Sequence, residues 1–356
     1  MKNKVLTGLL LVLIGGWGSL SAQSAGSNYA RQVNTLIGTK GVGLTSGYLY
    51  PGATYPYGMV QFTPSYFSKR SGFVINQLSG GGCEHMGNFP TFPVKGKLKM
   101  SPDNILNYRI NISEEKGHAG YYEAKVQEDI HAKLTVTERT GMASYEYSAD
   151  QQYGTVIIGG GISATPIEQA AIVITAPNKC EGYAEGGNFC GLRTPYKVYF
   201  VAEFDTDALE SGTWKRNELK PNATFAEGEY SGVYFTFDVN KKKNIQYKIG
   251  VSYVSVENAR ENLKAENTGW DFLQIQNQAE SKWNHYLGKI EVEGSNPDRT
   301  TQFYTHLYRS FIHPNVCSDV NGEYMGADFK VHKSRSKHYT SFSNWDTYRT
   351  QIQLLS

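Results

Sequence analysis

The chain has 356 residues, enough for one large domain and part of a second, and its 35 Lys and Arg nearly balance its 33 Asp and Glu. This balance argues against nucleic acid and anionic lipid as partners, since both attract proteins through an excess of basic side chains. The 25 Tyr, 16 Phe and 5 Trp favour a surface for neutral, hydroxylated ligands, although Tyr also packs well in sheets.

Residues 1–23 have the pattern of a secretory signal peptide. Two lysines precede an apolar run at residues 5–14, and small residues follow, with cleavage expected near Ala22 or Ala25. The run is too short to span a membrane, so we expect a secreted or periplasmic protein that has no membrane contact after cleavage. Cleavage also removes the two lysines, which leaves 33 basic and 33 acidic side chains.

Residues 24–257 predict a large antiparallel β-sandwich. The segments 131–138, 197–205 and 232–239 alternate between apolar and polar side chains, and 248–256 is a further β-rich run. Gly, Pro, Asn and Asp separate these segments, as turns require. Period-two alternation over many short segments is typical of a mainly β fold in which one face of each strand is buried.

The apolar period changes near residue 257 to spacings of three and four, which predicts helices. Phe272 to Ile290 form an amphipathic stripe, which Thr268 and Asp271 precede in the form of a capping box. Asn296 and Pro297 then read as a cap and a first helical position. We expect a linker helix region at residues 258–295.

A third helix is expected from Phe342 to the last residue, within a second domain that starts at residue 296. Ile352, Leu354 and Leu355 continue an apolar helical pattern up to the last residue. The few short helices predicted before them provide little apolar surface to cover these side chains. We therefore expect residues 296–356 to be the truncated start of a larger helical domain.

The stretch around Trp345 carries chemistry suited to sugars. An indole offers a flat apolar face to the C–H side of a pyranose, while the neighbouring Asp346 can accept, and Arg349 can donate, hydrogen bonds with hydroxyl groups. On a helix, Asp346 and Arg349 would share a face. The alternative is an ordinary helix start, with Trp345 in the core and the two charged residues as a surface pair.

Two glycine-containing loops are further candidates. Residues 50–61 combine tight turns with three Tyr, and residues 79–90 place Cys83, Glu84 and His85 beside three consecutive glycines. Glycine lets a backbone approach a ligand closely, and Glu84 with His85 could bond sugar hydroxyls. The alternative is that both loops are sheet edges whose glycines only make turns.

The four cysteines lack the spacing of a zinc or thioredoxin site. Cys180 and Cys190 flank a glycine-rich loop and could pair in an oxidising compartment. Sequence alone leaves all three pairings of Cys83, Cys180, Cys190 and Cys317 open, as well as four free thiols.

Five stretches in the same order resemble glycoside hydrolase family 92, the exo-acting α-mannosidases. They are VNTLIGT at 33–39, PGATYPYGMV at 51–60, GGNFCG at 186–191, KIGVSYVSVENAR at 248–260 and FSNWDTYR at 342–349. Residues 72–80 depart from the family, because they read GFVINQLSG where many members have GFSHTHLSG. The resemblance therefore does not assign a preferred mannosidic linkage.

The resemblance implies an N-terminal sandwich, linker helices and an (α/α)6 barrel that together hydrolyse terminal α-linked mannose of N-glycans or mannans. It implies a calcium-dependent inverting mechanism, with calcium ligands and both catalytic carboxylates in barrel residues missing from this chain. The expected substrate-binding residues in this chain are Trp345, Asp346, Arg349, Cys83, Glu84 and His85. Without the carboxylates, we expect the 356-residue chain alone to be inactive. The competing hypothesis is a carbohydrate-binding module without catalysis.

Overall fold

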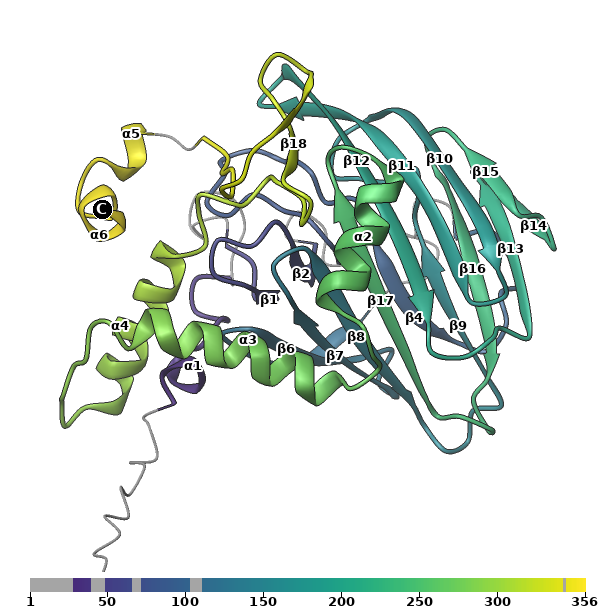
Figure 1. The fold of residues 1–356 in the computed structure, drawn as a ribbon. Helices are drawn as coiled ribbons and strands as arrows, with labels where there is room; N and C mark the ends of the chain where they lie inside the picture. The colour runs from purple at the N-terminus through teal and green to yellow at the C-terminus, as the bar shows by residue number, and fades with distance from the viewer. Residues whose placement is uncertain (1–27, 40–48, 66–71, 103–110, 342–343) are drawn as a thin grey trace, which may run out of the picture.

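The computed structural model describes residues 28–39, 49–65, 72–102, 111–341 and 344–356. Figure 1 shows two large β-sheets packed face to face, with most of the helices at one side and one helix lying along the strands. The mainly β sandwich predicted from the sequence is confirmed. The signal peptide predicted for residues 1–23 lies outside the described residues.

Within the described residues, eight strands form one antiparallel sheet and nine form the other. The first has the order β1 (Ala53–Thr54), β2 (Gln61–Pro64), β3 (Phe73–Val74), β4 (Thr91–Lys95), β9 (Tyr153–Ile158), β16 (Ser231–Asp238), β13 (Glu210–Lys215) and β14 (Glu218–Pro221). The second has the order β15 (Phe225–Glu227), β10 (Ile167–Ala176), β11 (Lys179–Phe189), β12 (Leu192–Phe204), β17 (Asn244–Ser252), β8 (Thr140–Tyr147), β7 (Ile130–Val136), β6 (Tyr121–Val126) and β5 (Ile112–His118). A hairpin of β18 (Glu323–Met325) and β19 (Val331–Lys333) stands apart from both.

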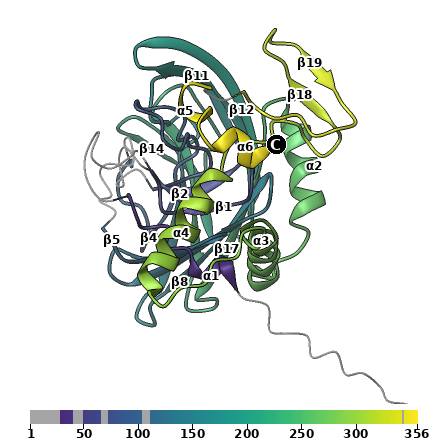
Figure 2. The same cartoon turned by 90° about the vertical axis from the view of Figure 1, so that its left-hand side faces the viewer.

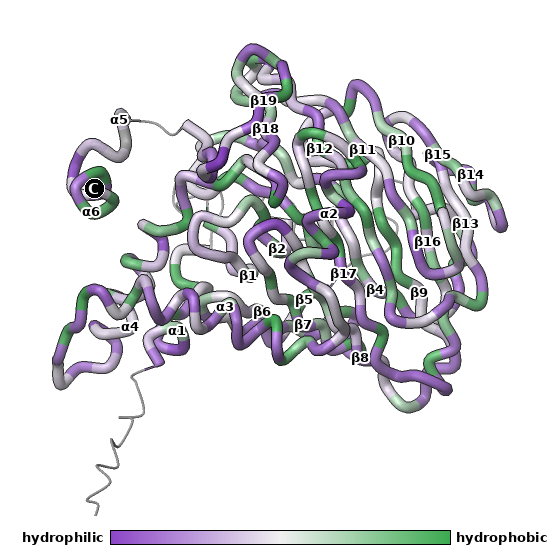
Figure 3. Tube along the Cα trace, viewed as in Figure 1, coloured by the Kyte–Doolittle hydropathy of each residue, from purple (hydrophilic) through white to green (hydrophobic). Residues whose placement is uncertain are grey.

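The predicted alternation matches burial in β12, where Val198 and Phe200 are buried and Tyr199 is partly exposed, whereas β16 is buried on both faces. In β16, Val233, Phe235 and Phe237 point into the core between the sheets, and Figure 3 shows hydrophobic and hydrophilic colours mixed along single strands. The run predicted at 248–256 is wrong at its end, because β17 stops at Ser252. The side chain of Ser255 accepts a hydrogen bond from the Asn258 backbone N–H, and this cap starts the helix α2 (Val256–Glu266) instead.

Much of the tyrosine content is core rather than ligand-binding surface. Tyr122, Tyr145, Tyr147 and Tyr247 are each at most 2% exposed. The Tyr247 ring packs 5.2 Å from Phe204 between the sheets, and burial raises the pKa of its hydroxyl. Tyrosine serves here as a large apolar side chain, so its abundance says less about ligands than the sequence suggests.

The helices α1 (Tyr29–Gln32), α3 (Phe272–Leu287) and α4 (Pro297–Ser310) lie at the β1 side of the sandwich. The cap predicted at Asn296 is confirmed, since its side chain accepts from two backbone N–H groups of α4. The box predicted at Thr268 is wrong, because the Asp271 side chain itself caps α3. Ile290 lies beyond the end of α3, where Gly288 closes the last turn. None of the helices in the described residues combines the length and apolarity needed to cross a bilayer.

The single helix predicted from Phe342 onwards is two short helices, α5 (Asn344–Thr347) and α6 (Gln351–Leu355). Thr350 between them has a φ of 61°, a left-handed conformation that breaks a helix. Phe342 itself lies outside the described residues. α6 packs on α4 through Leu354 and Leu355, which touch the core around Trp283.

Trp283 of α3 fixes the helices to the sandwich. Its side chain is fully buried, its indole N–H donates to the Thr54 carbonyl at 2.7 Å, and its ring lies 4.6 Å from that of Tyr308 in α4. The Tyr308 hydroxyl in turn bonds the Thr54 hydroxyl at 2.8 Å. In α4, the Arg309 guanidinium donates to the Thr35 carbonyl at 2.7 Å. The helices therefore meet the β1 region through packing and directed hydrogen bonds together.

A buried polar network holds the segment after α4 against α2. Asp319 accepts hydrogen bonds from Ser252 at 2.7 Å, Asn258 at 2.9 Å and Asn262 at 2.6 Å. Burial raises the pKa of this carboxyl, while the three hydrogen bonds oppose that rise. This network attaches the base of the β18–β19 hairpin to the sandwich.

Replacing Trp283 with Ala should lower the free energy of unfolding by about 3–5 kcal/mol, because the change leaves a cavity and an unpaired Thr54 carbonyl. Trp345→Ala is the matched control, since Trp345 is 85% exposed, and should change stability by less than about 0.5 kcal/mol. Urea unfolding curves would measure both. Equal destabilisation by the two variants would contradict the docking role of Trp283.

Glu280 of α3 should make stability depend on acid pH. It is buried beside β5 and α1, where it accepts hydrogen bonds from His118 at 2.8 Å and Arg31 at 3.1 Å. Burial raises the pKa of this carboxyl, but the bonds from His118, Arg31 and Gln276 outweigh it and lower the pKa from 4.5 to about 2. A lowered carboxyl pKa contributes stability above the unfolded pKa, and this contribution is lost as the pH falls towards 2.

Glu280→Gln should therefore be less stable than the wild type at pH 6, and the gap should shrink between pH 4.5 and 2. Thermal unfolding of both proteins across this pH range measures the gap. A gap that stays constant down to pH 2 would show that Glu280 is not held as a carboxylate by its partners.

Candidate carbohydrate-binding site

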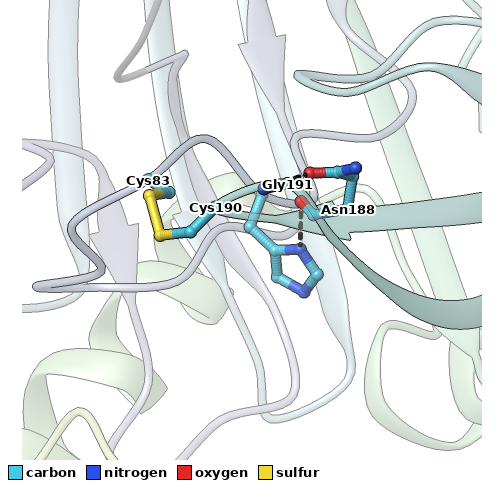
Figure 4. Close-up of a disulfide and its surroundings, with 5 residues drawn as sticks. Cys83, Asn188, Cys190 and Gly191 are labelled. Atoms are coloured by element: carbon cyan, nitrogen blue, oxygen red, sulfur yellow. Dashed lines mark hydrogen bonds between the residues drawn. A yellow bond between two sulfur atoms is a disulfide. The ribbon is translucent and has the colours of Figure 1, made fainter.

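A disulfide joins the glycine loop at residues 79–90 to the β11–β12 hairpin. Cys83 pairs with Cys190, across 107 positions in the sequence (Figure 4). Cys180 and Cys317 are free thiols. The pairing of Cys180 with Cys190 that the sequence suggested is wrong, because the two lie at opposite ends of β11. Ten residues of strand separate them by about 33 Å.

The His85 ring contacts aromatic side chains of the β11–β12 hairpin. Its Nδ1 donates to the Asn188 carbonyl at 3.3 Å, and its ring meets Phe189 and Tyr196 edge-on at 5.7 and 5.6 Å. Burial lowers the pKa of this imidazole, which the bond to Asn188 only partly opposes. At neutral pH the ring is uncharged, and the Nδ1 proton leaves Nε2 as a hydrogen-bond acceptor.

Glu84 lies next to His85 with an exposed side chain. An exposed carboxylate can accept hydrogen bonds from hydroxyl groups of a ligand without losing a structural partner. Cys83 and His85 therefore contact the β11–β12 hairpin, whereas the Glu84 side chain is exposed to solvent.

His313 connects this loop to the helices, and sequence reasoning missed it. Its Nε2 accepts from the Ser79 backbone N–H at 3.3 Å, so the residues after α4 support the start of the loop. Burial lowers the pKa of the His313 imidazole, and its bond to Asn315 opposes this only in part. The only sequence signal nearby is Pro314, which marked the end of a helix and gave no hint of a contact 234 positions away.

The tyrosine loop at residues 50–61 belongs mainly to the core. Tyr50 is fully buried, and the Tyr57 ring packs edge-on against Tyr286 at 5.4 Å and Phe311 at 6.0 Å. Only Tyr55 and Tyr57 are half-buried. Tyr50 is therefore a core residue and is not available to bind a ligand.

Trp345 presents its indole to solvent, with 85% of the residue exposed. Within this chain, Trp345 therefore lies outside the core. Arg349 lies after the end of α5, and its Nε donates to the Tyr348 hydroxyl at 2.7 Å. The predicted helical pair of Asp346 and Arg349 is therefore wrong, because the helix ends at Thr347. The backbone of Asp346 lies in α5, and its side chain is outside the described part.

α6 holds this region through Gln351, whose side-chain amide donates to the Ser310 carbonyl at 3.0 Å. In the described part of the chain, no hydrogen bond, ion pair or ring contact joins Trp345 or Arg349 to Glu84 or His85. The predicted site residues thus occupy two groups, one on the sandwich loop and one on α5 with the turn after it.

Calcium requires several oxygen ligands around one point. Among residues 28–39, 49–65, 72–102, 111–341 and 344–356, no three His, Cys, Asp or Glu side chains gather closely enough to hold a metal ion. The described residues therefore do not fit a calcium site by themselves, and no step of a reaction is assigned to a metal here.

The disulfide should stabilise the fold by about 2–5 kcal/mol, since it closes a long loop in the unfolded chain. Dithiothreitol should lower the urea midpoint of the wild type and leave that of a Cys83→Ser, Cys190→Ser double variant unchanged. Thiol titration in denaturant checks the pairing. Cys83→Ser should expose three titratable thiols, whereas a Cys180–Cys190 bridge would leave one.

Two protein-family domains match this chain, one over the sandwich and one over the residues that follow it. Residues 32–252 match the glycosyl hydrolase family 92 N-terminal domain, and residues 258–356 match the glycosyl hydrolase family 92 catalytic domain. An uncharacterized secreted glycosidase of Arthroderma benhamiae is 26% identical over 90% of this chain and 45% of its own length.

Two solved structures have the same fold. A family GH92 α-mannosidase of Bacteroides thetaiotaomicron in complex with mannoimidazole is 25% identical, with a TM-score of 0.81 over 92% of this chain and 46% of that chain. A GH92 inverting mannosidase of B. thetaiotaomicron VPI-5482 is 23% identical, with a TM-score of 0.78 over 92% and 46%. This chain therefore spans about half the length of these relatives.

The first family match alone covers more than half of the 356 residues, and the second follows it directly. The chain belongs to glycosyl hydrolase family 92.

Proposed function

We propose that the whole protein hydrolyses terminal non-reducing α-linked mannose of N-glycans or mannans, and that this chain supplies the sandwich and part of the mannose-binding site. The observation that carries the proposal is Trp345, 85% exposed within the FSNWDTYR stretch that resembles the family. A solvent-facing indole is costly to leave uncovered and is the side chain best suited to stack on a pyranose.

Mannose as the substrate is supported by the relatives. One structural neighbour is an α-mannosidase in complex with mannoimidazole. In this chain, Trp345 and Asp346 would hold the terminal mannose, and Glu84 and His85 would meet the sugar that leaves. Arg349 would donate to hydroxyl groups once its bond to Tyr348 opens.

The proposed reaction is inverting and uses calcium. An inverting glycosidase needs one carboxylic acid that protonates the leaving oxygen and one carboxylate that activates water on the opposite face, roughly 6.5–9.5 Å away. We assign both carboxylates and the calcium ligands to parts of the protein outside this chain. What the chain's own residues contribute is orientation of the substrate.

We also propose that the protein works outside the cytoplasm. Residues 1–23 have the signal-peptide pattern, the Cys83–Cys190 bridge suits an oxidising compartment, and the A. benhamiae relative is described as secreted. Mannose-bearing glycans are accessible in that setting.

Trp345→Ala in the protein with a complete catalytic domain should lower kcat/KM on an aryl α-mannoside by roughly a hundredfold, since loss of substrate positioning can cost that much. Phe225→Ala is the matched control, because Phe225 is also exposed, at 53%, but lies on the edge strand β15. EDTA should abolish turnover of the wild type, and added Ca²⁺ should restore it.

The 356-residue chain alone should show no turnover, because acid and base catalysis each contribute typically 10²–10⁴-fold. Turnover of this chain comparable to that of the complete protein would overturn the assignment of the carboxylates. Sugar binding by a complete protein that never hydrolyses any α-mannoside would instead support a binding module.

A further inference from the structure

We propose a second carbohydrate-binding site, for a neutral oligosaccharide, in a hollow on the outer face of the nine-stranded sheet beside the start of α3. The hollow has a volume of about 690 Å³, within the range of about 300–1,000 Å³ common for small-molecule sites. Its lining residues are Tyr121, Lys133, Ser144, Asn244, Gln246, Trp270, Asp271, Phe272, Leu273 and Gln276. None of these is a residue assigned to mannose hydrolysis.

The floor of the hollow is a row of polar side chains across three strands. Lys133 of β7 pairs with Ser144 of β8, and Ser144 pairs with Gln246 of β17. Adjacent strands lie about 4.8 Å apart, so the three side chains point the same way at neighbouring positions.

Several polar groups in the lining of the hollow have hydrogen-bonding capacity that the fold does not use. Among the described residues, neither the Lys133 ammonium nor the side-chain amide of Gln246 has a hydrogen-bond or ion-pair partner. Asn244 accepts from Ser144 at 2.7 Å through Oδ1, which leaves its NH₂ group free. Gln276 donates to Glu280 at 2.7 Å through Nε2, which leaves its carbonyl oxygen free. Donors and acceptors thus converge on one space, as recognition of hydroxyl groups requires.

Aromatic residues form the walls. Trp270 is partly exposed and rests against the small apolar cluster that anchors the first turn of α3, while the Lys248 ammonium lies over its ring at 4.4 Å. The Tyr121 ring stands edge-on to Phe272 at 6.4 Å, and its hydroxyl donates to Glu123 at 2.8 Å. Both rings are held by neighbours, so little conformational entropy is lost when a ligand packs on them.

The lining carries no excess of either charge, which is compatible with a neutral ligand. Lys133 and Asp271 are its two charged residues, and they balance each other. The Asp271 carboxylate already caps α3 by accepting from the Gln274 backbone N–H at 3.0 Å. Amides and hydroxyls between aromatic walls fit a sugar better than an apolar peptide, which would leave the polar floor unsatisfied.

The hollow is separate from the proposed catalytic region. Figure 1 shows the start of α3 close to β8, with α5 and α6 beyond the other end of that helix. A glycan held at this distance would keep the protein on a polymeric or branched substrate without entering the hydrolytic pocket. The second site does not depend on hydrolysis by the protein.

Binding can be measured on the 356-residue chain by affinity electrophoresis in gels containing α-mannan, with calorimetry using an α-mannotetraose. Wild-type protein should be retarded by mannan. Trp270→Ala should weaken binding about tenfold, because an aromatic contact is worth about 1 kcal/mol or more. Gln246→Ala, a substitution on the sheet surface that leaves the core intact, should weaken it about fivefold.

Phe225→Ala, an exposed aromatic control, should bind like the wild type. Because Trp345 belongs to the other proposed site, Trp270→Ala should weaken binding in a Trp345→Ala background as it does in the wild type. Retained affinity in both Trp270→Ala and Gln246→Ala, or no binding by the wild type, would overturn the proposal. A loss confined to Trp345→Ala would also overturn it while supporting the proposed mannose site. Loss in the two hollow variants alone supports the second site, whatever the outcome of the hydrolysis assay.

Discussion

The rest of the structure depends on one contact, the hydrogen bond from the Trp283 indole N–H to the Thr54 carbonyl. This bond lies within the packing of α3 and α4 on the β1 region. The sandwich and the helices each bury apolar surface, and this junction combines that packing with directed hydrogen bonds between them. The junction also places the residues after α4 beside the glycine loop, where His313 meets Ser79. The proposed site thus relies on two parts of the chain that are joined by packing far from the sugar.

The two groups of proposed binding residues are supported in different ways. The loop with Cys83 and His85 is fastened by a covalent bridge and by ring contacts. Trp345, in contrast, stands in solvent on a four-residue helix. A rigid loop can select among leaving sugars at little entropic cost, whereas an exposed tryptophan gains its contacts only from a ligand or a further segment of protein. This difference fits a chain that spans half the length of its relatives.

Aromatic content is a poor guide to where sugars bind in this protein. Tyr122, Tyr145 and Tyr247 contribute to the core, and Trp283 joins the sandwich to the helices. The aromatic residues that matter for the two proposed sites are Trp345, which is exposed, and Trp270 and Tyr121, which are partly exposed. Accessibility separates the two uses of the same side chains.

The sequence by itself determined the mainly β sandwich, the change to helices near residue 257, the cap at Asn296 and the family, because each depends on local period or on short ordered motifs. Most helix ends, the break between α5 and α6, the Cys83–Cys190 bridge and the contact of His313 with Ser79 were decided only by the tertiary structure. The pairing of two cysteines separated by 107 positions cannot be predicted from the residues next to either one. Which residues meet across the sandwich depends on strand order and packing, which act between segments that are distant in the sequence.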